Sequence, residues 1–425
     1  MSNWPAPLAA GPVTGRVVIP GSKSASARSL LLAALAERPA TLTGVLDSRD
    51  TRLMRDGLHA LGARFTDVAD GGLRVDPIDA VPGGTAIDVG LSGTVLRFLP
   101  PIAALSETAT TFYGDPGVSA RPIAPLLDAL VGMGAQVDQT VTPFRIHGGA
   151  SFRGGAVRID AHASSQFISA LLLSAARLPE GVEVHHHGGP LPSRPHIAMT
   201  CTLLARHGVA VHQPAPDVWQ VAAGPITARD EHIEPDLTNA ATMLAAAVVT
   251  GGCLSTAWPQ DSVQAGAELA AVLAAFGGEL RYLGSGADRV LEVTGPEVIQ
   301  AVDLDLSAIS EITPVAAALA ALADGPSRLR GVGHIRGHET DRLAALATEL
   351  ERLGAQVEAD ADSVSITPGP RQGGVFATYA DHRMAHAGAL IGLVTPGLEL
   401  DDVACTTKTL PDFPHLWHSL IKGTW

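Results

Sequence analysis

The stretch Pro20-Gly21-Ser22-Lys23-Ser24-Ala25-Ser26-Ala27-Arg28 stands directly before the apolar run 29–36. The β-branched segment Val17-Val18-Ile19 precedes it, so the pattern predicts a strand, a tight turn and the start of a helix. A helix start exposes unpaired N–H groups and the positive end of the helix dipole, and here hydroxyls, one lysine and one arginine accompany it. This indicates a site for a phosphate or carboxylate; the alternative is a serine-capped helix with two solvated cations.

The same pattern recurs along the chain at steps of about 70 residues, which indicates internal repeats. Each predicted helix is followed by a short strand, a second helix that ends at glycine, and a β-hairpin. Six repeats of the type α-β-α-β-β-β therefore account for nearly the whole chain, and the fold class is α/β. The polar clusters that begin the repeats lie at Ser24, Ser92, Ser164, Asp236, Ser307 and Tyr379.

The two ends of the chain do not fit complete repeats. The sixth repeat stops before its hairpin, and the strand-like segment 15–19 has no repeat of its own. We expect the N-terminal segment to supply strands that the last repeat lacks. One domain would then be discontinuous in sequence.

The composition limits the class of protein. A chain of 425 residues can form two domains, and with 46% hydrophobic but only 4% aromatic residues its core must consist mainly of Ala, Val and Leu. The net charge of −14 argues against nucleic acid as a partner. The N-terminus lacks a signal-peptide pattern, no apolar run reaches membrane-spanning length, and the three cysteines are far apart. We therefore expect a cytoplasmic protein with no membrane partner.

Polar and cationic residues are concentrated where the predicted helices begin. If these ends converge, an acidic protein acquires a basic cleft, and arginine forks suit carboxylates and phosphates. Two acids, Glu311 and Glu339, are candidates for proton transfer in such a cleft. The alternatives are ordinary helix caps and ion pairs, with Glu311 as a cap and Glu339 paired to Arg342. The residues at the helix starts include Lys23, Ser24, Arg28, Thr94, Arg97, Arg121, Ser164, Ser165, Gln166, Ser193, Arg194, Arg342 and Arg383, and the last repeat adds Lys408.

The histidines do not predict a metal site. The run His185-His186-His187 has no accompanying cluster of cysteines or carboxylates, so we expect a solvated strand end. The pairs His334/His338 and His382/His386 have i, i+4 spacing, but neither has the glutamate of an HExxH zinc motif. We expect no metal and no cofactor.

Eight motifs are spread in order along the chain: PGSKSASAR (20–28), LSGTVLRF (91–98), GDPGVSARPI (114–123), SSQF (164–167), LPSRPHI (191–197), RGHETDRL (336–343), YADHRMA (379–385) and TTKTLPDFP (406–414). Together they resemble the motifs of the 5-enolpyruvylshikimate-3-phosphate synthases. The resemblance implies two similar domains, each of three βαβαββ-type units, with the active site in the cleft between them. It places the domains at 20–234 and at 1–19 plus 235–425.

The resemblance also implies a reaction and the residues that carry it. The enolpyruvyl group of phosphoenolpyruvate would be transferred to the 5-hydroxyl of shikimate 3-phosphate, with release of phosphate. Glu311 would accept the proton of the attacking hydroxyl, and Glu339, with Lys23, would serve the proton transfers at the methylene carbon. Shikimate 3-phosphate would be held by Lys23, Ser24, Arg28, Ser164, Ser165, Gln166, Ser193, Glu311 and His338. Phosphoenolpyruvate would be held by Lys23, Gly93, Arg121, Gln166, Arg342, Arg383 and Lys408.

The chain departs from the family pattern at Ala27, Leu91, Phe98, Glu311 and His338, where Asn, Asn, Pro, Asp and Lys are commoner. The histidine would make part of the charge of the site depend on pH. Gly93 would leave room for phosphoenolpyruvate and for the family's inhibitor glyphosate, so a side chain there would lower the affinity for the inhibitor.

Two other interpretations remain at this point. One is the sister enzyme that acts on UDP-N-acetylglucosamine, although the loop 114–119 lacks the reactive cysteine that many of its members carry. The other is a non-catalytic repeat protein that binds anions. We expect a monomer whose partners are the two small-molecule substrates.

Overall fold

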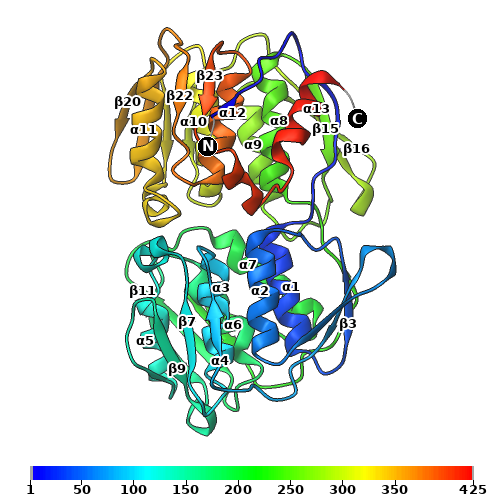
Figure 1. Cartoon of the computed structure of the whole chain (residues 1–425), viewed down its shortest axis with the longest axis vertical. Helices are drawn as coiled ribbons and strands as arrows, with labels where there is room; N and C mark the ends of the chain where they lie inside the picture. Colours follow the sequence, from blue (N-terminus) through cyan, green and yellow to red (C-terminus); the bar gives the residue numbers. More distant parts are fainter. Residues whose placement is uncertain (1–2, 424–425) are drawn as a thin grey trace. The chain divides into compact units, whose positions relative to one another are not determined.

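The computed structural model describes residues 3–423, apart from the side chain of Asp70. The chain divides into two compact units, and Figure 1 shows their elements. Residues 21–234 form the first, here called the continuous unit. Residues up to 20, together with those from 235 onward, form the second, here called the discontinuous unit. The chain passes between the two units at Pro20–Gly21 and at Glu234–Pro235.

The continuous unit contains the first three repeats. Its first repeat has α1 (Lys23–Leu35), β3 (Ala40–Thr43), α2 (Arg49–Ala60), β4 (Arg64–Asp67) and β5 (Leu73–Asp76). Its second has β6 (Ala86–Asp88), α3 (Gly93–Phe98), α4 (Pro100–Ala103), β7 (Thr110–Tyr113), the 3₁₀ turn η2 (Pro116–Ala120), α5 (Ala124–Gly132), β8 (Gln136–Val137) and β9 (Phe144–His147). Its third has β10 (Gly155–Asp160), α6 (Gln166–Ala175), β11 (Val182–His187), α7 (Arg194–Arg206), β12 (His212–Ala215) and β13 (Val218–Val221), and β14 (Glu231–His232) follows.

The discontinuous unit contains β1 (Trp4–Pro5), β2 (Thr14–Val17) and the last three repeats. The fourth repeat has α8 (Leu237–Thr250), β15 (Cys253–Ala257), α9 (Gly266–Ala275), β16 (Glu279–Leu283) and β17 (Val290–Thr294). The fifth has β18 (Asp303–Asp305), the 3₁₀ turn η5 (Ser310–Ile312), α10 (Thr313–Ala321), β19 (Ser327–Arg330), the 3₁₀ turn η6 (Gly333–Gly337), α11 (Arg342–Arg352), β20 (Gln356–Ala359) and β21 (Ser363–Thr367). The sixth has β22 (Gly374–Phe376), α12 (His382–Gly392), β23 (Leu398–Leu400), the 3₁₀ turn η7 (Ala404–Lys408) and α13 (Phe413–Lys422).

Each repeat is built around one small sheet. In the second repeat the strand order is β6-β7-β9-β8, with β6 and β7 parallel across a helical connection and the remaining pairs antiparallel. The order β18-β19-β21-β20 in the fifth repeat has the same pattern. A parallel pair needs a crossover connection, and in the second, third, fifth and sixth repeats the first helix of the repeat provides it. The predicted α/β class and βαβαββ repeat are therefore confirmed.

The strands next to the two crossing points are exchanged between repeats. β2 precedes α1 in sequence but pairs parallel with β15, with Cys253 opposite Thr14. β14 precedes α8 but pairs parallel with β3, with Glu231 opposite Leu42. Each thus covers a strand edge that would otherwise leave its backbone groups unpaired.

This pairing corrects one expectation from the sequence. The segment 15–19 was expected to complete the last repeat, but its strand ends at Val17 and joins the sheet of the fourth repeat. The last repeat is completed by the two residues of β1, where Trp4 lies opposite Leu400. The first strand of a repeat must lie parallel to the strand that follows its helix, and in the fourth repeat only β2 occupies that place.

The first helices of the repeats form the centre of each unit. In the discontinuous unit α8, α10 and α12 contact one another, and Figure 1 shows them side by side. In the continuous unit α6 contacts both α1 and α3. Their alanines, such as the buried run Ala316–Ala318, allow close helix packing, which confirms the predicted Ala-, Val- and Leu-rich core. Among residues 3–423, no helix combines the length and apolar character that crossing a membrane requires.

Candidate active site

The helix α1 begins as its sequence predicts. Ser22 is the N-cap, and its hydroxyl accepts a hydrogen bond from the backbone N–H of Ala25 at 3.3 Å. Lys23 is the first helical residue, and its ammonium lies 3.5 Å from a carboxylate oxygen of Asp50, at the start of α2. The lysine side chain is 19% exposed and the aspartate 5%, so this charge is anchored but still reaches solvent.

Arg28 is buried and is held by the protein itself. Its Nε donates to the hydroxyl of Thr200 at 2.7 Å, and its Nη1 donates to the backbone carbonyl of Ser24 at 2.9 Å. Its guanidinium also lies over the ring of Phe98, 5.1 Å from the ring centroid. Phe98 is one of the departures from the family pattern, and here it forms part of the packing that orients Arg28. Arg28 in turn fixes the first turn of α1, which carries Ser24.

A second group of predicted residues meets at the start of α3. A Cβ atom added to Gly93 would lie 2.9 Å from Nη2 of Arg121 and 3.1 Å from Nη1 of Arg97. Arg97 Nη1 donates to the side-chain oxygen of Gln166 at 2.8 Å, and Arg121 Nη1 donates to the carbonyl of Leu91 at 2.8 Å. The structure therefore brings Gly93, Arg121 and Gln166 together. Arg97 links them; the sequence placed it at a helix start but did not include it in the site.

Arg121 does not begin a helix, contrary to expectation. It follows the 3₁₀ turn η2, and α5 begins only at Ala124. Its backbone is extended, with φ −79° and ψ 129°. The reason is that a residue before proline, here Pro122, is driven away from the helical region.

The predicted serines lie at two further helix starts. The hydroxyl of Ser164 accepts from the backbone N–H of Gln166 at 3.3 Å, and Ser165 is the N-cap of α6. Ser193 is the N-cap of α7 and has a left-handed backbone, with φ 48°. Non-glycine residues seldom adopt this conformation, which is common at functional sites.

In the discontinuous unit, Arg342 is the centre of a charged cluster. Its Nε lies 2.7 Å and its Nη2 3.1 Å from the two carboxylate oxygens of Asp381. Its Nη2 also lies 3.0 Å from an oxygen of Glu339, and its Nη1 donates to Nδ1 of His338 at 2.9 Å. Burial alone would lower the pKa of this guanidinium, but Asp381 and Glu339 outweigh burial and raise it. Arg342 is therefore a fixed cation.

Glu339 lies between two cations. One of its oxygens pairs with Arg342, and the other contacts the ammonium of Lys408 at the end of η7. The expected ion pair between Glu339 and Arg342 is thus present, together with a second partner that the sequence did not indicate. The carboxylate is 8% exposed and the lysine 12%.

Glu311 lies in the 3₁₀ turn η5, directly before α10. The hydroxyl of the preceding residue, Ser310, is 2.6 Å from Nε2 of His334. Burial lowers the pKa of His334, while the negative charge of Glu311 opposes this effect. The negative charge of Glu311 also acts to raise the pKa of Arg342 and of Arg383, so it lies within electrostatic range of both guanidiniums.

Arg383 is positioned by two residues that sequence reasoning missed. Its backbone N–H donates to Asp381 at 2.8 Å, and its Nη1 donates to the side-chain oxygen of Asn239 at 2.9 Å. Asn239 also donates to the carbonyl of Thr409, next to Lys408, at 3.2 Å. Burial lowers the pKa of Arg383, and Asp236 and Glu311 oppose this effect. The position of Asp381 as N-cap before His382-Arg383 was the signal that could have identified it.

The histidines are engaged in local contacts. The strand β11 extends to His187, where His185 contacts Glu183 at 2.5 Å and His186 contacts the carbonyl of Gly189 at 3.0 Å. Within the described part of the chain, no three His, Cys, Asp or Glu side chains are arranged to hold a metal ion.

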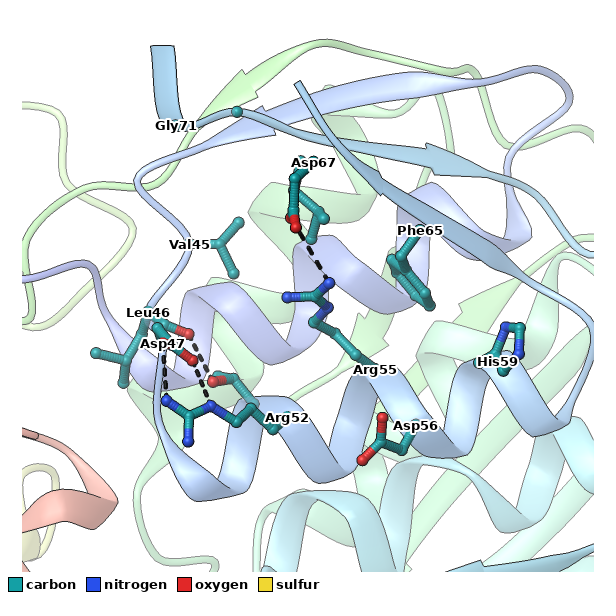
Figure 2. A pocket seen from close by; sticks show the side chains of 13 residues that line it. Val45, Leu46, Asp47, Arg52, Arg55, Asp56, His59, Phe65, Asp67 and Gly71 are labelled. Carbon is teal, nitrogen blue, oxygen red and sulfur yellow. Dashed lines mark hydrogen bonds and ion pairs between the residues drawn. The ribbon is translucent and has the colours of Figure 1, made fainter. Parts of the chain in front are cut away.

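A pocket of about 630 Å³ lies in the first repeat, between α2 and the hairpin β4–β5 (Figure 2). Its arginines already face carboxylates: Arg52 contacts both oxygens of Asp47 at 2.6 and 2.8 Å, and Arg55 lies 3.8 Å from Asp67. None of the predicted site residues lines this pocket. We assign it no function.

Comparison with known proteins agrees with this arrangement. Residues 8–417 match the sequence model of the family described as EPSP synthase (3-phosphoshikimate 1-carboxyvinyltransferase). The chain is 49% identical over 428 residues to the 3-phosphoshikimate 1-carboxyvinyltransferase of Mycobacterium ulcerans (strain Agy99), covering 99% of this chain and 98% of that protein.

Solved structures share the fold at low sequence identity. An EPSP synthase from Acinetobacter baumannii has a TM-score of 0.80 at 22% identity and covers 98% of this chain and 97% of its own. The enolpyruvyl transferase NikO from Streptomyces tendae has a TM-score of 0.77 at 20% identity, with coverages of 97% and 96%. Since the family match spans nearly the whole chain and the Mycobacterium relative is about half identical to it, the chain belongs to the EPSP synthase family.

Proposed function

We propose that this chain performs the reaction of its family. The enolpyruvyl group of phosphoenolpyruvate is transferred to the 5-hydroxyl of shikimate 3-phosphate, and phosphate is released. The observation that carries the proposal is the buried cluster in which Asp381 and Glu339 hold Arg342 as a fixed cation. Such a group stabilises phosphate and carboxylate charge without reorganising during the reaction.

Most of the proposed groups for the phosphorylated acceptor lie in the continuous unit. The helix starts that carry Ser24, Ser164, Ser165 and Ser193 present hydroxyls and backbone N–H groups, which suit a phosphate. Lys23 contributes a partly exposed positive charge, and Arg28 orients the first turn of α1. Glu311 and His338 complete this set.

Phosphoenolpyruvate carries a phosphate and a carboxylate, and the proposed groups around it are cations. Gly93 leaves space beside Arg121, and Gln166 is oriented by Arg97. Lys23, Arg342, Arg383 and Lys408 complete this set.

The reaction proceeds by addition and elimination. The 5-hydroxyl oxygen attacks the C2 atom of phosphoenolpyruvate, Glu311 takes the hydroxyl proton, and the methylene carbon gains a proton from Glu339, assisted by Lys23. In the second step that carbon returns a proton to Glu339, and the bond between C2 and the phosphate oxygen breaks. The phosphate leaves with the electron pair of that bond and with the proton held by Glu311, which returns Glu311 to its ionised form. The contact between Lys408 and Glu339 supports the role of Glu339, because the ammonium is an adjacent source of the proton.

The sister reaction with UDP-N-acetylglucosamine is not favoured by the family match. The deciding experiment measures phosphate release from phosphoenolpyruvate with each acceptor in turn. We expect release with shikimate 3-phosphate only, and release with the UDP-sugar only would refute the proposal. Glu311→Gln should retain binding of both substrates and lose turnover. If the parent protein itself binds both substrates but never releases phosphate, the chain is an anion-binding protein and not an enzyme.

We also propose that the chain acts as a monomer in the cytoplasm. The three cysteines, Cys201, Cys253 and Cys405, are free thiols, which is typical of proteins from a reducing compartment. Light scattering coupled to gel filtration should give one chain mass, and a larger mass would contradict the monomer.

A further inference from the structure

The loop that leads into α12 has an unusual backbone. Tyr379 and Ala380 both have φ of +55°, and neither is glycine. Two consecutive non-glycine residues in the left-handed region are strained, and such a loop persists only when surrounding contacts hold it. The residue that follows is Asp381, the buried partner of Arg342.

Two acids hold this loop. Asp401 accepts from the backbone N–H and the hydroxyl of Thr378, both at 2.8 Å, and Glu349 on α11 binds the residues on either side of Thr378. Glu349 is fully buried, and its Oε1 accepts a hydrogen bond from the hydroxyl of Tyr379 at 2.8 Å. Its Oε2 accepts from the backbone N–H of Ala377 at 3.0 Å and from Arg352 at 2.8 Å. Burial and the hydrogen bond to Glu349 raise the pKa of the Tyr379 hydroxyl, so this group remains a donor.

The helix α11 therefore contacts the loop at two points. At its first residue Arg342 binds Asp381, and seven residues later Glu349 binds Tyr379. Residues seven apart lie on the same face of a helix, two turns from each other. Asp401 holds Thr378, and the hydrogen bond from Tyr379 to Glu349 fixes the next residue against this face of α11. The position of the Asp381 carboxylate at the guanidinium therefore depends on the contact at Glu349.

We propose that Glu349 and Tyr379 are a positioning pair that places Asp381, and through it Arg342, for binding the anionic groups of phosphoenolpyruvate. This inference rests on the proposed function. Neither residue of the pair is assigned a contact with substrate, and both act through the orientation of Arg342.

The test is Tyr379→Phe, which removes one hydroxyl and keeps the ring. We expect the Michaelis constant for phosphoenolpyruvate to rise roughly three- to tenfold, the range that loss of one ordinary hydrogen bond produces, because the pair acts on the substrate only through Arg342. The Michaelis constant for shikimate 3-phosphate should stay within about twofold, since the pair acts on Arg342 alone. The matched control is Tyr282→Phe, a tyrosine of similar exposure on β16 of the same unit, which should leave both constants as in the parent.

A second variant checks that the two residues act together. Glu349→Gln should also raise the Michaelis constant for phosphoenolpyruvate, and the double variant should raise it no further than the larger single effect. Additive effects would show that the residues act separately and would overturn the pair. The thermal unfolding midpoint of each variant, compared with that of Tyr282→Phe, separates loss of fold from loss of positioning.

The outcomes distinguish this inference from the proposed function. If the parent releases phosphate with shikimate 3-phosphate and Tyr379→Phe leaves the constant for phosphoenolpyruvate unchanged, or raises both constants equally, only the positioning pair is refuted. If the parent releases no phosphate with that acceptor, the proposed function fails and the inference fails with it.

Discussion

Arg342 and Asp381 form a two-point ion pair inside the discontinuous unit, with N–O distances of 2.7 and 3.1 Å. Their side chains are 2% and 0% exposed. The pair joins the first residue of α11 to the N-cap of α12, so one contact fixes both helix starts. Asp381 also accepts from the backbone N–H of Arg383. It therefore orients two residues that are proposed to bind phosphoenolpyruvate, Arg342 and Arg383.

Asp381→Asn should therefore weaken phosphoenolpyruvate binding and the fold together. Removing one partner of a buried pair typically costs about 3–5 kcal/mol of stability; because Glu339 still faces Arg342, we expect about 2–3 kcal/mol. The Michaelis constant for phosphoenolpyruvate should rise at least about tenfold. Urea unfolding and steady-state kinetics measure the two effects. The control Asp412→Asn, at an 81% exposed side chain, should change neither, and an unaltered unfolding curve for Asp381→Asn would contradict the importance of the pair.

Gly93→Ala should raise the Michaelis constant for phosphoenolpyruvate by roughly three- to tenfold, equivalent to about 1 kcal/mol. The new methyl carbon would lie 2.9 Å from Arg121 Nη2 and 3.1 Å from Arg97 Nη1, so a guanidinium must move. Gly132→Ala is the matched control, because its Cβ would have no neighbour within 4 Å on the helix α5. Equal kinetics for the two variants would show that Arg121 is not confined by Gly93.

Lys23→Met should abolish turnover while leaving the fold intact. The lysine is assigned to both substrates, and losing a cation at the reacting groups should lower kcat/KM by about a thousandfold or more. Its pair with Asp50 is 3.5 Å long and partly exposed, so the loss of stability should remain below about 1–2 kcal/mol. Phosphate release and urea unfolding provide the two measurements, with the exposed Lys422→Met as control. Near-normal turnover would remove Lys23 from the catalytic set.

His386 should make the protein less stable in mild acid. It is fully buried on α12, neither ring nitrogen has a hydrogen-bond partner among the described residues, and burial lowers its pKa well below 6.5. Below pH 6.5 the unfolded chain therefore binds a proton that the folded chain does not, so the free energy of unfolding falls as pH falls. One such group contributes a slope of at most about 1.4 kcal/mol per pH unit.

The measurement is urea unfolding between pH 5 and pH 7. His386→Leu should flatten the pH dependence of the free energy of unfolding relative to the parent, while His415→Gln, at a 77% exposed side chain, should not. Identical slopes for the parent and His386→Leu would show that this histidine does not contribute.

Much of the fold follows from local pattern. The steps of about 70 residues, the serine caps and the glycine helix ends predicted six α/β repeats, because caps and turns depend on neighbouring residues in the chain. Lys23, Gly93, Gln166 and Arg342 were expected at helix starts, and each is the first residue of its helix. Arg121 was also expected at a helix start but does not begin a helix, because the proline that follows drives its backbone away from the helical region.

The sequence by itself thus determined the repeat, the α/β class, the Ala-rich core and the family, since each depends on residues that are neighbours in the chain or on motifs in a fixed order. Only the tertiary structure decided that β2 pairs with β15 and β14 with β3, because strand pairing joins residues more than 180 positions apart. It also decided that Asp381 accepts from Arg342, that Asn239 accepts from Arg383, and that Arg97 donates to Gln166. A buried guanidinium must find acceptors in space, and which acceptors it meets depends on how the helices pack.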